Sequence, residues 1–92
     1  MASQPTRRRH IIRRMCEQGD AVTTWETGTD TENDAEAQGA VREAERIFQE
    51  ALVRGDVPFA IDADKGPQKL DRWDARAREA DEIVIAPRLM GG

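Results

Sequence analysis

The sequence predicts an α+β fold in which one long helix packs across a small mixed sheet, and a polar N-terminal arm precedes this domain. Three observations predict it: a long amphipathic helix pattern between Asp34 and Gly55, strand-like segments on both sides of that pattern, and an apolar triplet at 83–85. A helix with one apolar face has to bury that face, and a sheet formed by the flanking segments is the simplest surface for it.

Apolar residues are concentrated in the second half of the chain. Of the sixteen Leu, Ile, Val and Phe residues, only Ile11, Ile12 and Val22 precede residue 41. A domain of about 60 residues buries only about 60% of its unfolded surface, so we expect a binding partner to stabilise this one. The imbalance predicts a basic N-terminal arm over 1–20, a compact α+β domain over 21–87 with a polar linker over 27–34 inside it, and a flexible tail over 88–92.

The segment upstream of the helix contains one clear strand signal. Residues 21–26 are rich in β-branched and aromatic side chains, with Val22 and Thr24 on one face and Trp25 on the other. Residues 1–18 are compatible with a short basic helix with a partial apolar stripe, and such a helix is marginal in water without packing.

The helix pattern has a recognisable beginning and end. Asp34 can accept hydrogen bonds from the first free N–H groups, and Glu36 favours the positive end of the helix dipole. Gly55 follows the last periodic residue and favours a left-handed stop. Apolar residues recur at the spacing of one helical face, at Ala37, Ala40, Val41, Ala44, Ile47, Phe48, Ala51 and Leu52.

Two strand signals follow the helix. Residues 57–61 alternate between larger and smaller side chains, and Pro58, which cannot donate a ladder bond, marks either a sheet edge or the beginning of the strand. Residues 68–74 are expected to return as a short strand that places Leu70 near the core.

The last strand signal is the strongest. Ile83, Val84 and Ile85 are apolar on both faces of a strand, which favours a central position in the sheet. The preceding residues, 75–82, read as a polar connector or one helical turn, and Pro87 ends the strand.

Charge is distributed in blocks, although the net charge is only -4. Residues 16–36 contain seven acids and no Lys or Arg, whereas the first fifteen residues contain five Arg and no acid. A basic arm can bind phosphates, so nucleic acid is a possible partner, and an acidic protein or the acidic block itself is the alternative. No aromatic residue is interleaved for base stacking. The basic arm residues are Arg7, Arg8, Arg9, Arg13 and Arg14.

Motifs for catalysis and for resident cofactors are absent from the sequence. His10 and Cys16 are the only residues of their types, and we expect both to lie on the surface of the arm rather than to bind a metal. We therefore predict a protein that is not an enzyme and has no catalytic residue, no metal and no bound cofactor. One cysteine and no long apolar run favour a cytoplasmic protein without a membrane partner.

The most specific pattern lies at the end of the sequence. After the last strand signal come Pro87, Arg88, Leu89, Met90, Gly91 and Gly92. This pattern resembles the C-terminus of ubiquitin-like β-grasp proteins, and EIVIAPRLMGG is most similar to the small sulfur-carrier proteins of that superfamily.

The resemblance implies a reaction at the last residue. In that family an activating partner enzyme uses ATP to adenylate the terminal carboxylate, which is then converted to a thiocarboxylate or joined to an amine. Gly92 would react, and Gly91 would be its slender neighbour, because residues without side chains fit a narrow channel. Pro87, Arg88, Leu89 and Met90 would form the partner-binding tail.

The resemblance covers about ten residues closely, and the order of elements agrees with it over a longer stretch. A β-grasp domain opens with a hairpin before its helix. Here only residues 21–26 are a clear upstream strand, and 10–15 would have to supply the second strand despite its arginines.

Three functions remain open from the sequence. The first is a ubiquitin-like modifier or sulfur carrier activated at Gly91 and Gly92. The second is a non-enzymatic assembly protein of a multiprotein particle, which uses its arm and tail as binding segments. The third is a nucleic-acid-binding accessory protein that uses the arginine arm.

Overall fold

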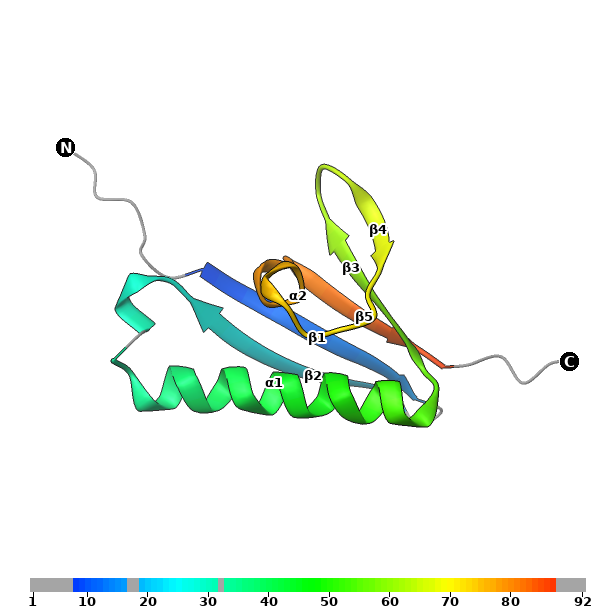
Figure 1. Cartoon of the computed structure of the whole chain (residues 1–92), viewed down its shortest axis with the longest axis horizontal. Coiled ribbons are helices and arrows are strands. Elements are labelled where there is room, and N and C mark those ends of the chain that lie inside the picture. The colour runs from blue at the N-terminus through cyan, green and yellow to red at the C-terminus, as the bar shows by residue number, and fades with distance from the viewer. Residues whose placement is uncertain (1–7, 17–18, 32, 88–92) are drawn as a thin grey trace, which may run out of the picture.

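The computed structural model of the chain describes residues 8–16, 19–31 and 33–87. These residues form strands, one long helix and two short helical segments (Figure 1). In chain order the elements are β1 (Arg8–Cys16), β2 (Gly19–Thr27), the 3-10 turn η1 (Thr29–Thr31), α1 (Ala35–Arg54), β3 (Val57–Asp62), β4 (Gly66–Lys69), α2 (Ala75–Glu79) and β5 (Glu82–Ala86).

The strands of the described residues form one five-stranded mixed sheet in the order β2-β1-β5-β3-β4. β1 pairs with β2 in an antiparallel hairpin and with β5 in parallel, whereas β3 is antiparallel to both β4 and β5. The expected α+β class with one long helix across a mixed sheet is confirmed. The expected central position of the last strand is also confirmed, because β5 lies in the middle of the order.

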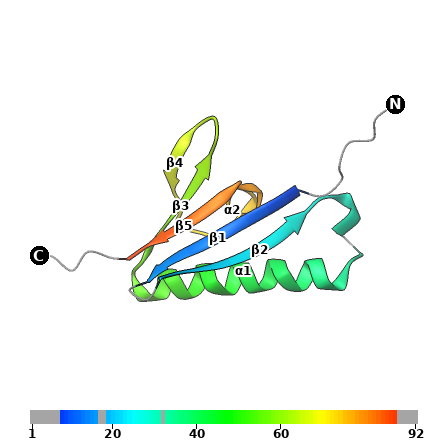
Figure 2. The same cartoon turned by 180° about the vertical axis from the view of Figure 1, so that it is seen from behind.

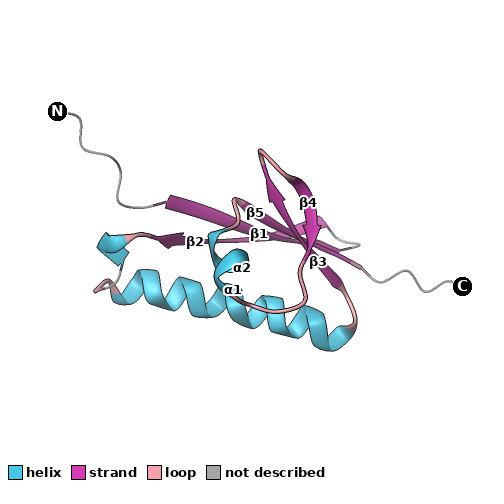
Figure 3. Ribbon diagram, turned by 45° about the horizontal axis from the view of Figure 1, so that its top comes forward, coloured by secondary structure: helices cyan, strands magenta, loops and turns pink. Residues whose placement is uncertain are grey.

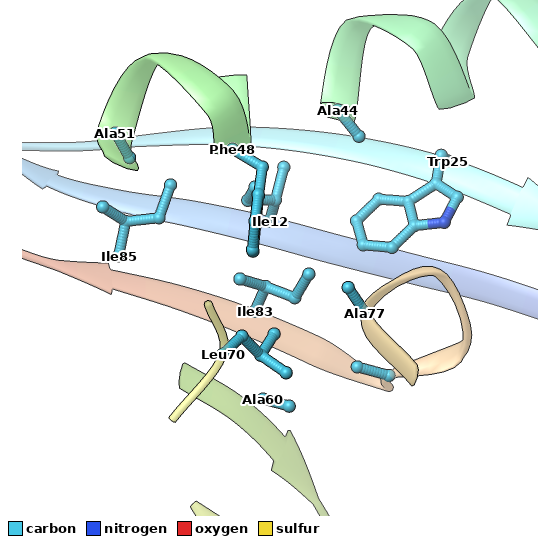
Figure 4. Close-up of a cluster of buried hydrophobic side chains, with 11 residues drawn as sticks. Ile12, Trp25, Ala44, Phe48, Ala51, Ala60, Leu70, Ala77, Ile83 and Ile85 are labelled. Carbon is cyan, nitrogen blue, oxygen red and sulfur yellow. The ribbon is translucent and has the colours of Figure 1, made fainter. Parts of the chain in front are cut away.

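Both helices lie on one face of the sheet (Figure 3). Alternate residues of the inner strands point toward α1 and α2, as the two-residue period of a strand requires. Figure 4 shows these side chains meeting the buried face of α1, from which Phe48 points toward the strands. The buried apolar cluster contains Ile12, Trp25, Ala44, Phe48, Ala51, Ala60, Leu70, Ala77, Ala80, Ile83 and Ile85.

The ends of α1 agree with the prediction. The Asp34 carboxylate accepts hydrogen bonds from the backbone N–H groups of Glu36 and Ala37, at 3.0 and 3.2 Å. Gly55 ends the helix with φ 88°, in the left-handed region where a residue without Cβ has little strain.

The region between β3 and β5 agrees with the prediction in part. Pro58 lies near the beginning of β3, opposite Ile85, and Leu70 is buried as expected. The prediction of a strand over 68–74 is wrong in extent, because β4 ends at Lys69. Asp74 instead caps α2, the helical turn expected in 75–82, and accepts a bond from the Ala77 N–H at 3.1 Å.

The expected arm over 1–20 does not agree with the structure. Residues 8–16 are β1, an inner strand, so the helical interpretation of 1–18 is wrong there, and the compact domain begins before residue 21. The physical reason is long-range pairing. Ile12 lies opposite Ile83, and local periodicity carries no information about a partner that distant in sequence. Residues 1–7 and 17–18 lie outside the described residues.

Candidate functional site

The tail predicted to react follows directly from the central strand. β5 ends at Ala86, which lies opposite Val57 at the beginning of β3. The exposed Pro87 comes next, and a residue without an N–H cannot extend the ladder. In Figure 1 this end of β5 lies at the same end of the molecule as the last turn of α1. Residues 88–92, which include both glycines of the predicted reaction, lie outside the described residues.

The arginines of the basic block are divided between the two faces of β1. Strand alternation places Arg9 and Arg13 on the face opposite the helices, and Arg8 and Arg14 on the helix side. Arg13 forms an ion pair with Glu82 at 3.6 Å, and Arg8 forms one with Asp81. The four arginines that the structure describes are therefore part of the sheet rather than of a separate basic arm. Arg7 lies outside the described residues.

The pair between Arg8 and Asp81 joins the beginning of β1 to the residue before β5. The hydrogen bond from the Arg8 guanidinium lowers the pKa of the Asp81 carboxyl below its usual range. The Asp81 N–H in turn donates to the Asp62 carboxylate at 3.1 Å, which connects β3 to the same corner. Because these groups are half exposed, the pair positions the strand ends more than it stabilises the fold.

His10 is a feature that the sequence analysis placed wrongly. Its side chain is fully buried, at 0% exposure, although a surface position was expected. Nδ1 lies 2.6 Å from the Ala80 carbonyl oxygen, which can only accept, so Nδ1 carries the proton and donates. Nε2 lies 2.7 Å from the Thr27 hydroxyl oxygen, and that hydroxyl donates to the Glu79 carboxylate at 3.5 Å. The imidazole is a structural connector, with both nitrogens used inside the protein.

An aromatic cluster continues from His10 into the core. The imidazole stacks on Trp25, with ring centroids 5.1 Å apart and planes 19° apart. Trp73 tilts against Trp25 at 5.6 Å and meets the ring of Phe48 at 5.5 Å. The Trp25 indole N–H donates to the Arg78 carbonyl at 3.1 Å, so its one polar group is satisfied. This cluster fixes α1 and α2 to the sheet.

The sheet face opposite the helices is uncovered in the described part of the chain. From that side, β1 and β5 pass in front of α2 (Figure 2). Val22, Arg13, Val84 and Phe59 lie side by side across four strands of this face. Val22 and the nearby Met15 are about half exposed, at 52% and 49%. Arg13 interrupts the apolar side chains of this row, and the exposed apolar surface is concentrated at Val22 and Met15 near the β2 edge.

The described residues contain no group of three or more His, Cys, Asp or Glu side chains that could hold a metal ion. None of the helices in the described ranges has the length and apolar content to cross a membrane. Asp64 lies in the turn between β3, which ends at Asp62, and β4, which begins at Gly66. Comparison of the chain with protein-family models, with curated proteins and with solved structures finds no match.

Proposed function

We propose that this chain is a ubiquitin-like protein of the β-grasp family, without a catalytic site of its own, that acts through Gly91 and Gly92. A single observation carries the proposal: the central strand of the sheet leads through Pro87 directly into the sequence Arg88–Gly92. The folded domain then serves to present a reactive end, and the chemistry belongs to an activating partner enzyme.

The sheet supports the β-grasp part of the proposal. The family resemblance implies a hairpin before the helix, and the sequence alone supplied only one clear strand there. β1 and β2 form an antiparallel hairpin upstream of α1. The first and last strands are parallel neighbours in the middle of the sheet, and one long helix crosses a single face. This arrangement agrees with the implied order over the described domain.

The proposed reaction takes place at the carboxylate of Gly92. A carboxylate oxygen displaces pyrophosphate from ATP and forms an acyl adenylate. A lysine amine then displaces AMP and, after loss of a proton, gives an amide, or hydrosulfide displaces AMP and gives a thiocarboxylate. Two residues without side chains allow this end to enter a narrow channel. The proposal requires that Gly92 carries the free carboxylate in the functional protein, which the mass of the native protein measures.

Mass spectrometry of the protein from its native cells tests this proposal. The chain should carry either the mass change for replacement of one oxygen by sulfur, or a covalent adduct to a second protein. Trypsin cleaves after Arg88, so an amide adduct leaves the remnant Leu-Met-Gly-Gly on a target lysine. Deletion of Gly91 and Gly92 should abolish both products.

A matched glycine variant serves as the control. Gly39 lies on α1, and a Cβ added there meets nothing within 4 Å, so Gly39→Ala should leave thiocarboxylate or adduct formation intact. Equal product from the tail deletion and the full chain would exclude the proposed function.

The remaining alternatives differ in their support. An assembly role is favoured by the uncovered sheet face with Met15 and Val22, and it predicts partner binding that survives deletion of Gly91 and Gly92. A nucleic-acid role is less well supported, because Arg8 and Arg13 pair with Asp81 and Glu82. Steep loss of duplex affinity with rising salt would be its signature.

A further inference from the structure

β2 forms one edge of the sheet and has the features of a strand that can pair with an additional strand. Its nine residues pair with β1 on one side, and no strand of the described chain pairs with the other side. Alternate residues of an antiparallel edge strand direct their N–H and C=O groups outward. Natural proteins protect such edges with Pro, Lys or bulges, and β2 contains no Pro and no Lys.

A cavity of about 170 Å³ adjoins this edge. It lies between β2 and the first turns of α1, and its apolar walls include Trp25 and Ala37, which are 1% and 6% exposed. Glu26, Asp34 and Glu36 also line the cavity together with one cation, Arg9, so acids outnumber bases there. A long side chain from an added strand can place its aliphatic stem against Trp25 and Ala37 and its cationic end at the carboxylates.

The acidic charge near the outer edge of β2 favours a basic binding partner. The described residues 19–31 and 33–36 contain β2, η1 and the first residues of α1, and their sequence has five acids and no Lys or Arg. Pairing of two copies through β2 about Thr23 would set Asp20 opposite Glu26 of the second copy. Like charges opposed across strands are unfavourable. A basic strand from another protein is therefore a better partner than a second copy.

We propose that the outer edge of β2 binds an extended basic segment of a protein partner, which adds to the sheet as a further strand and inserts one Lys or Arg side chain into the cavity between β2 and α1. Backbone hydrogen bonds supply the affinity, and the cavity and the acids supply the specificity. The surface is independent of Gly91 and Gly92, so the full chain and the tail deletion should bind such a segment equally well.

Peptide titration of the full chain tests this proposal. The probe is a seven-residue peptide of alternating Lys and Val, with the Glu/Val peptide of the same length as its counterpart. The basic peptide should bind and shift the backbone amide NMR signals of β2, and the acidic peptide should not. Glu36→Lys should weaken the basic peptide about tenfold, as expected for loss of a charge-assisted contact. Asp71→Lys makes the same charge change in a loop beyond β4 and should leave the affinity unchanged.

Backbone methylation separates strand addition from simple charge attraction. An added strand directs alternate N–H groups toward β2. Two Lys/Val peptides, methylated on one or the other set of alternate nitrogens, should therefore differ, with one losing binding and the other retaining it. Equal binding of both would overturn the proposal, as would equal weakening by Glu36→Lys and Asp71→Lys. Self-association through β2 that excludes the peptide would also overturn it, because a second copy would then be the occupant.

Discussion

His10 connects three parts of the chain through one buried ring. Its nitrogens reach Ala80, between α2 and β5, and Thr27 at the end of β2, while its face lies on Trp25. A buried polar group is tolerated when every hydrogen-bonding atom has a partner, and both nitrogens of this ring have one. The residue therefore determines how the end of β2 lies against the segment that precedes β5.

Replacement of His10 tests this role. His10→Ala removes the stack on Trp25, opens a cavity and leaves the Ala80 carbonyl without its donor, so the free energy of unfolding should fall by about 2–4 kcal/mol. Urea denaturation monitored by tryptophan fluorescence measures the change. The exposed neighbour Arg9→Ala should change stability by less than about 0.5 kcal/mol. Similar urea midpoints for the two variants would contradict a structural role of His10.

At the scale of elements, α1 shows how local rules and packing combine. Asp34 and Gly55 define its ends through hydrogen bonding and a left-handed turn. Its buried face carries Ala44, Phe48 and Ala51, which are fully enclosed against the strands. Small residues on either side of Phe48 let the helix approach the sheet closely, and the ring fills the space between them.

Alanine substitution of Gly39, which lies in α1, and of Gly55, which is the C-cap of α1, should change the stability of the protein in opposite directions. Gly39→Ala should raise stability by about 1 kcal/mol, because alanine loses less backbone entropy in a helix and its Cβ meets no atom within 4 Å. Gly55→Ala should lower stability by about 1 kcal/mol, because the position has φ 88°. Thermal unfolding should show shifts of about 4–8 °C in opposite directions. Shifts in the same direction would refute this explanation.

At the scale of the whole molecule, the earliest and latest strands are neighbours. β1 lies between β2 and β5, so the centre of the sheet forms only when the two ends of the domain meet. Contacts between such distant segments are costly to form and cannot be replaced by local structure. This connectivity places β5, and therefore the beginning of the tail, in the most constrained part of the sheet.

Truncation at the boundary suggested by composition should abolish folding. A chain of residues 21–92 retains the helix and the apolar second half but lacks β1, so β2 and β5 each lose a neighbour. We expect no cooperative thermal transition by circular dichroism and no dispersed NMR spectrum. A synthetic peptide of residues 1–20, added to the fragment, should restore dispersion. A cooperative transition of the fragment alone would instead support a separate N-terminal arm.

The sequence-based prediction is accurate for features that depend on short-range interactions and inaccurate for features that depend on long-range ones. α1 with its cap at Asp34, the strand around Trp25 and the central Ile83–Ile85 triplet were predictable, because each depends on patterns within one segment. β1 and the burial of His10 were not, because arginines on both sides of Ile11 and Ile12 obscure the alternation. The tail residues of the candidate site could be predicted from the sequence alone. The edge position of β2 and the cavity beside it could not.

The sequence by itself determined the class of the fold, the long helix, the strand that leads to the tail and the division of charge into blocks. These features depend on composition and on short periodicities, which act within one element. Only the tertiary structure decided that Arg8, Arg9, Arg13 and Arg14 belong to an inner strand, that β2 forms an edge and that a cavity with more acids than bases lies beside it. The reason is physical: strand order and register depend on which distant segments bury one another's surfaces, and no single segment contains that information.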